Sequence, residues 1–114
     1  NPGNIWNLFK DFNISESKMI GYWVDNSPIK IKSDKIRSTI YQNENKILIC
    51  IASWSEKDEL IDLIIDWDKI KFNISGSSLL SPEIENLQEL KSYQIGKKIK
   101  INSNEGLILV LSKI

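Results

Sequence analysis

The stretch that decides the fold is Ile47-Leu48-Ile49-Cys50-Ile51-Ala52, an uninterrupted apolar run with polar residues on both sides. The run is shorter than an ordinary helix, and its three isoleucines are β-branched, which favours a strand. A strand with one face in water would alternate apolar and polar residues, and this run does not. We therefore expect a strand that is buried on both faces.

A second apolar run, Leu107-Ile108-Leu109-Val110-Leu111, follows a turn signal at residues 102–106. Shorter segments with alternating apolar and polar residues fill the chain between the two runs, for example residues 36–42 and 59–67. Strands that recur roughly every ten residues are typical of an all-β fold. The sequence therefore predicts an antiparallel two-sheet β-sandwich of about eight strands, with the two apolar strands inside the sheets.

The first residues show a helical period instead of a strand period. Their apolar side chains recur at i, i+3, i+4 and i+7, with one tryptophan beside the stripe: Ile5, Leu8, Phe9, Phe12 and Trp6. A helix this short is unstable alone in water, so it must dock on the sandwich or join it to a neighbour. We accordingly divide the chain into residues 1–16, a short N-terminal helix and linker from an upstream domain, and residues 17–114, the β-sandwich.

Composition limits the functions that are open to the chain. Its 114 residues correspond to one domain, and 15 basic residues balance 15 acidic ones. With a net charge of zero, the chain has no overall positive potential to attract a polyanion, so we expect no nucleic-acid partner. No apolar stretch approaches the ~18 residues of a membrane span. The single cysteine, Cys50, lies inside the first apolar run and is predicted to be a buried, unreactive thiol.

The chain contains no histidine, which excludes Ser-His-Asp and Cys-His nucleophiles and the usual zinc sites, so we expect no metal and no cofactor. Carboxylate pairs remain, because glycosidases need two acids about 5–9.5 Å apart. Asp66 with Asp68, and Glu83 with Glu85, would lie roughly 6.6 Å apart on a strand. Since no neighbouring group would keep one acid protonated, we interpret both pairs as the solvated face of a sheet or turn. We assign no catalytic residue.

The four tryptophans are the other candidates for a site. Trp54 shares a strand face with the apolar run, and Trp67 continues the apolar face of residues 61–65, so both are predicted to lie in the core. Trp6 and Trp23 are less determined: either can lie in the core, contact another domain or bind a sugar ring, and they are the candidates for a sugar-binding site. The candidates for contact with another domain are the helix stripe and one strand residue: Ile5, Trp6, Phe9, Phe12 and Trp23.

An ordered set of short motifs extends over residues 5–111 and resembles a known family. The motifs are Met19-Ile20-Gly21-Tyr22-Trp23, Ser27-Pro28-Ile29-Lys30, Ser38-Thr39-Ile40-Tyr41, Leu48-Ile49-Cys50-Ile51-Ala52-Ser53-Trp54, Ile64-Ile65-Asp66-Trp67, Ser81-Pro82-Glu83-Ile84-Glu85-Asn86-Leu87-Gln88 and Glu105-Gly106-Leu107-Ile108-Leu109. Together they resemble the C-terminal β-sandwich domain of large bacterial glycoside-hydrolase-like proteins related to glycoside hydrolase family 123. The chain departs from the family after Asp66-Trp67, where relatives have a short helical turn and a glycine.

The resemblance implies an upstream (β/α)-barrel that carries the catalytic acids and acts on N-acetylated hexosamines. None of those acids has a counterpart in this chain. The expected function is therefore that of a non-catalytic accessory domain, whose partner is the catalytic domain of the same protein. A carbohydrate-binding module that uses exposed aromatic side chains is the alternative, and its partner would be a glycan. The compartment stays open, with an exported parent, periplasmic or extracellular, as one option.

Overall fold

A computed structural model describes residues 18–21, 27–33, 35–43, 46–70, 77–84 and 88–113. In these residues the chain forms ten strands and one 3₁₀ helix, Trp67–Lys69. The strands are β1 (Lys18–Ile20), β2 (Ile29–Ile31), β3 (Ile36–Gln42), β4 (Lys46–Ser53), β5 (Glu59–Ile61), β6 (Leu63–Ile65), β7 (Ser77–Ser81), β8 (Lys91–Tyr93), β9 (Ile99–Ile101) and β10 (Gly106–Lys113). No helix in this part of the chain is long and apolar enough to cross a membrane.

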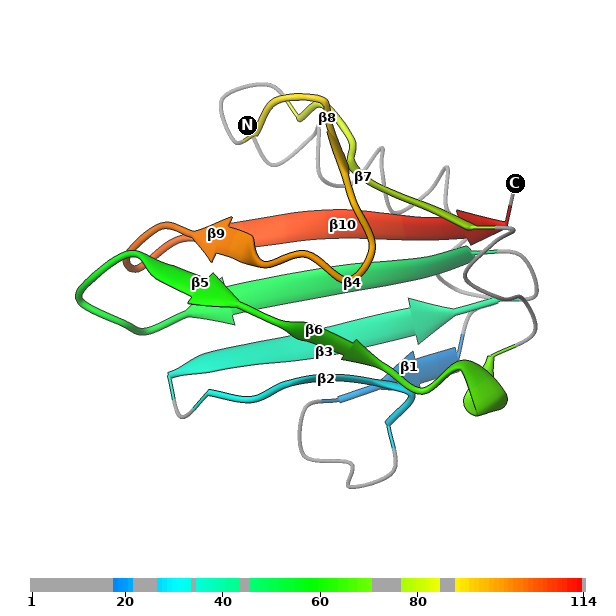
Figure 1. The fold of residues 1–114 in the computed structure, drawn as a ribbon. Helices are drawn as coiled ribbons and strands as arrows, with labels where there is room; N and C mark the ends of the chain where they lie inside the picture. Colours follow the sequence, from blue (N-terminus) through cyan, green and yellow to red (C-terminus); the bar gives the residue numbers. More distant parts are fainter. Residues whose placement is uncertain are drawn as a thin grey trace.

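Six strands form one antiparallel sheet in the order β1-β3-β4-β10-β7-β8. The two apolar runs are its central strands, β4 and β10, and they pair from Gly106 opposite Ala52 to Ser112 opposite Lys46. Two small sheets, β2-β6 and β5-β9, form a second layer in front of this sheet (Figure 1). The predicted all-β, antiparallel fold with both apolar runs inside a sheet is confirmed.

The main core lies between the two layers. We call the face of the six-stranded sheet toward the small sheets its inner face, and the opposite face its outer face. On the inner face, Ile47, Ile49 and Leu109 each expose 0% of their surface, and they pack with isoleucines of the second layer. On the outer face, Leu48 is also 0% exposed, in a smaller cluster with Ile84 and Ile108. Strand β4 therefore has buried residues on both faces.

The second layer differs from the prediction. Residues 59–67 are predicted as one strand, but the structure divides them at Asp62 into β5 and β6. Strand β5 pairs with β9 and β6 pairs with β2, so each half has its own partner. The expected two sheets of about eight strands are therefore three sheets and ten strands among the described residues. Alternation shows that Ile61, Leu63 and Ile65 share a face, but it does not show which strands pair.

The predicted N-terminal helix lies outside the described residues, and the boundary between residues 16 and 17 stays a prediction. Five candidate contact residues also lie outside them: Ile5, Trp6, Phe9, Phe12 and Trp23.

Candidate functional site

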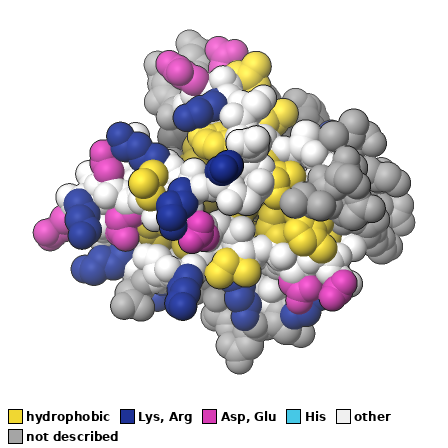
Figure 2. Space-filling view, in the orientation of Figure 1, with side chains coloured by type: hydrophobic (Ala, Val, Ile, Leu, Met, Phe, Trp, Pro, Cys, Tyr) yellow, Lys and Arg dark blue, Asp and Glu magenta, His cyan; other side chains and the backbone are white. Residues whose placement is uncertain are grey.

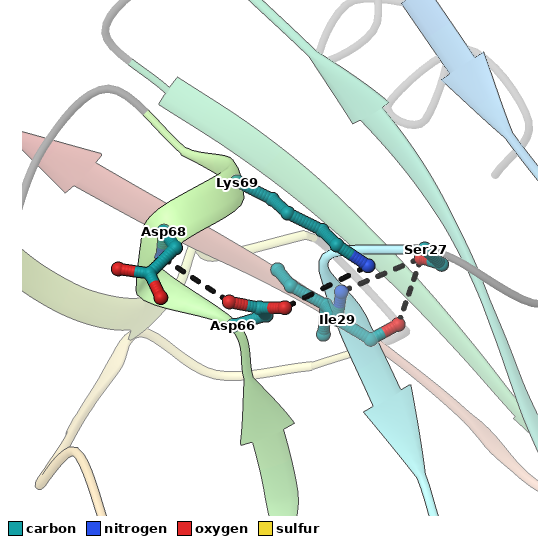
Figure 3. A network of polar contacts seen from close by, with 5 residues as sticks. All are labelled: Ser27, Ile29, Asp66, Asp68 and Lys69. Carbon is teal, nitrogen blue, oxygen red and sulfur yellow. Dashed lines mark hydrogen bonds and ion pairs between the residues drawn. The ribbon is translucent and has the colours of Figure 1, made fainter.

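The first acid pair that the sequence singles out lies at the start of the 3₁₀ helix, with Asp66 as its N-cap and Asp68 in its first turn. The Asp68 backbone N–H donates to Asp66 Oδ1 at 3.2 Å, and Asp66 Oδ2 lies 3.6 Å from Lys69 Nζ. In Figure 3 the Asp68 carboxylate points away from the ion pair between Asp66 and Lys69. The Asp66 N–H donates to the Pro28 carbonyl at 2.7 Å, which ties the start of the helix to the segment before β2. These contacts agree with the interpretation of the pair as part of a turn.

The short helical turn also bears on the departure from the family pattern. The sequence leaves residues 68–75 open between a strand and a helical turn. The structure shows a turn at Trp67–Lys69, followed by the buried Ile70, while residues 71–76 lie outside the described part.

In the second acid pair, Glu83 is exposed and Glu85 is not described. Within the described residues, no group of three or more acidic or cysteine side chains could hold a metal ion.

Trp54 is the clearest error of the sequence prediction. It is expected in the core, yet it is 59% exposed. Its place in the alternation is predicted correctly: Trp54 lies just past the end of β4, between the buried Ser53 and Ser55, and so continues the outer face of Leu48, Cys50 and Ala52. That face is covered over Leu48 but not at the end of the strand, where Ala52 is exposed too. Trp67, by contrast, packs against the main core as expected, although it is half-buried and not fully enclosed.

Cys50 is half-buried on the outer face, beside the smaller cluster. Burial raises the pKa of its thiol to about 11 from 9.0, because the thiolate is poorly solvated there. The thiol is therefore protonated at neutral pH, as the prediction of an unreactive side chain requires.

Among the described residues, two clefts bear on the search for a site. The larger, of about 730 Å³, lies between the segments before β3 and before β5, and its lining includes Lys32, Lys35, Lys57, Glu56 and Glu59. The hydroxyls of its two serines serve local turns, since Ser33 Oγ accepts from the Lys35 N–H and Ser55 Oγ from the Lys57 N–H. A smaller groove of about 210 Å³ lies beside Gln88 and Gly106.

Gln88 has a structural role that sequence reasoning misses. Strand β7 pairs with β10 only from Val110 onward, so the backbone of Ile108 has no strand partner on that side. The Gln88 side-chain amide takes the place of the missing strand partner. The Ile108 N–H donates to Gln88 Oε1 at 2.9 Å, and Gln88 Nε2 donates to the Ile108 carbonyl at 2.9 Å. Nε2 also donates to the Pro82 carbonyl at 2.7 Å. The feature of the sequence that could have indicated this role is the position of the glutamine at the end of the motif over residues 81–88.

We expect the substitution Gln88→Leu to lower the free energy of unfolding by about 1–3 kcal/mol, because leucine leaves the Ile108 N–H and carbonyl unpaired. Gln94→Leu is the matched control, since the exposed Gln94 uses only its backbone carbonyl in a described hydrogen bond. Urea denaturation of both variants measures the difference. Equal effects of the two substitutions would contradict the role given to Gln88.

Taken together, the described residues define an all-β sandwich domain in which the predicted acid pair serves the fold. Residues 1–112 match the family model of the glycoside hydrolase 123, C-terminal domain. The chain belongs to this family, which confirms the resemblance of its motifs. As a C-terminal domain, it implies an upstream domain in the same protein. No curated protein matches the chain, and no solved structure does.

Proposed function

We propose that the chain is a non-catalytic accessory domain of a glycoside hydrolase, which packs against an upstream catalytic barrel and stabilises it. The observation that carries this proposal is the family match, because it extends over residues 1–112 and assigns them to the C-terminal domain. The chain then needs no catalytic acids of its own, since the family resemblance assigns these to the barrel.

The described carboxylates support this proposal. Asp66 is engaged as a helix cap, and two other aspartates form exposed ion pairs, Asp62 with Lys98 at 2.9 Å and Asp58 with Lys100 at 3.6 Å. Exposed pairs of this kind contribute little to stability, and they are ordinary features of a solvated surface. Glu56 and Glu59 share the larger cleft and are therefore the carboxylates most in need of a direct test.

We expect the purified chain to hydrolyse aryl N-acetylhexosaminides no faster than buffer does. A glycosidase needs two carboxyl groups on opposite sides of the scissile bond, one of them protonated. The described Asp66, Asp62 and Asp58 instead cap a helix or form exposed ion pairs with lysines. Release of the aryl alcohol, followed by absorbance, measures the rate. Turnover that is abolished by Asp66→Asn, Glu83→Gln, Glu56→Gln or Glu59→Gln would contradict the proposal.

The alternative is a carbohydrate-binding module, and one observation favours it. Trp54 is an exposed aromatic side chain next to the small residue Ala52, at the end of a sheet face. Aromatic faces of this kind can receive a sugar ring. The same side chain also fits a protein interface, which would leave no room for a glycan on it.

A further inference from the structure

We infer that the upstream domain docks on the outer face of the six-stranded sheet and covers Trp54. This inference rests on the proposed function and adds the surface through which the domain acts. Its starting point is that the outer face, like the inner one, carries buried apolar side chains, although Arg37, Thr39 and Lys46 also lie on it. An antiparallel sheet commonly turns one polar face to water, but the outer face here carries Tyr41, Leu48, Cys50 and Val110.

The described part of the chain covers this face only in part. Ile84 packs over Leu48 and Ile108, and the apolar surface continues beyond them to Ala52 and Trp54. The strand neighbours of Ala52 leave that end open. Gly106 has no side chain, and the Arg37 guanidinium group donates to the carbonyls of Ser33 and Ile36. At the other edge of the same face, Met19 of β1 is 51% exposed.

The opposite surface of the molecule provides the contrast. Leu60 is 64% exposed and Ile64 is 49% exposed on the outer side of the second layer. Ion pairs flank them, between Asp62 and Lys98 and between Asp58 and Lys100. Figure 2 shows this surface from the front: on its left side small apolar areas lie among basic and acidic side chains, and a broader apolar area lies to the right of centre. Single apolar residues among charges, such as Leu60 and Ile64, are normal for a wetted surface, so we do not assign the upstream domain to that part of it.

The course of the chain favours the upstream domain as the occupant of the outer face. The described fold begins at β1, an edge strand of the six-stranded sheet (Figure 1). Met19 of that strand pairs with Tyr41 and therefore lies on the outer face. A domain that precedes β1 in the chain is therefore linked to this sheet at the edge that carries Met19, beside the outer face. Tryptophan is also one of the residue types enriched among the hot spots near the centre of protein interfaces.

Oxidative footprinting of the whole parent protein tests the inference, with each modified side chain located by mass spectrometry. The reference is the 114-residue chain under the same conditions. We expect the oxidation rate of Trp54 to fall roughly tenfold in the parent, as its 59% exposed surface becomes buried in an interface core. The matched control is Leu60, which is 64% exposed and should react at about the same rate in both proteins.

The outcomes separate this inference from the proposed function. If Trp54 reacts as fast in the parent as in the isolated chain, the docking surface is wrong, while an inactive chain would still support the accessory role. If N-acetylglucosamine or N-acetylgalactosamine protects Trp54 in the isolated chain, a glycan is the occupant and the inference is overturned. A substitution supplies the second readout: Trp54→Ser should lower the melting temperature of the parent more than Leu60→Ser does. Equal shifts would overturn the inference.

Discussion

Replacing Ile49 with alanine is expected to lower the free energy of unfolding by about 2–5 kcal/mol, which is a large share of the stability of a small domain. Ile49 lies in β4 directly between Ile40 of β3 and Leu109 of β10, and all three side chains are 0% exposed. Alanine would leave a cavity that the surrounding strands cannot fill, because each of them is held by neighbours on both sides.

The matched control is Ile64→Ala. It removes the same atoms from a side chain that is 49% exposed on the second layer, and we expect a change within about 0.5 kcal/mol. Urea denaturation gives both values. If Ile49→Ala fails to fold, Ile49→Val provides a smaller step of about 0.5–1.5 kcal/mol. An Ile49→Ala variant as stable as Ile64→Ala would show that β4 is not the centre of the fold.

The uninterrupted apolar runs predict the centre of the sheet correctly. A strand such as β4, with Leu48 on one face and Ile49 on the other, needs apolar cover on both sides, and this requirement can be read from the residues alone. The alternating segment over residues 36–42 likewise matches β3. Local pattern is sufficient in these cases because burial of each residue follows from its own strand.

The prediction fails where the answer depends on another part of the chain. Alternation places Trp54 on the correct face, but whether that face is covered depends on the segment around Ile84 and on what lies beyond it. The break at Asp62 depends on which strands are available to pair with β5 and β6. The role of Gln88 depends on where the pairing of β7 with β10 ends, and the residues around Gln88 do not predict that position.

The most direct test of the accessory role is the thermal unfolding of the parent protein with and without this domain. A domain that binds only the folded form of its neighbour stabilises it, and a covalent link makes the contact effectively intramolecular. Loss of the contact should therefore lower the melting temperature of the catalytic domain. For a large domain, an interface contribution of a few kcal/mol corresponds to roughly 5–10 °C.

Scanning calorimetry of the intact parent and of a version that ends before Lys18 provides the measurement. We predict that the truncated protein keeps its catalytic acids and hydrolyses substrate at low temperature, but melts roughly 5–10 °C lower than the intact protein. An unchanged melting temperature for the catalytic domain would contradict the claim that this sandwich serves to stabilise it.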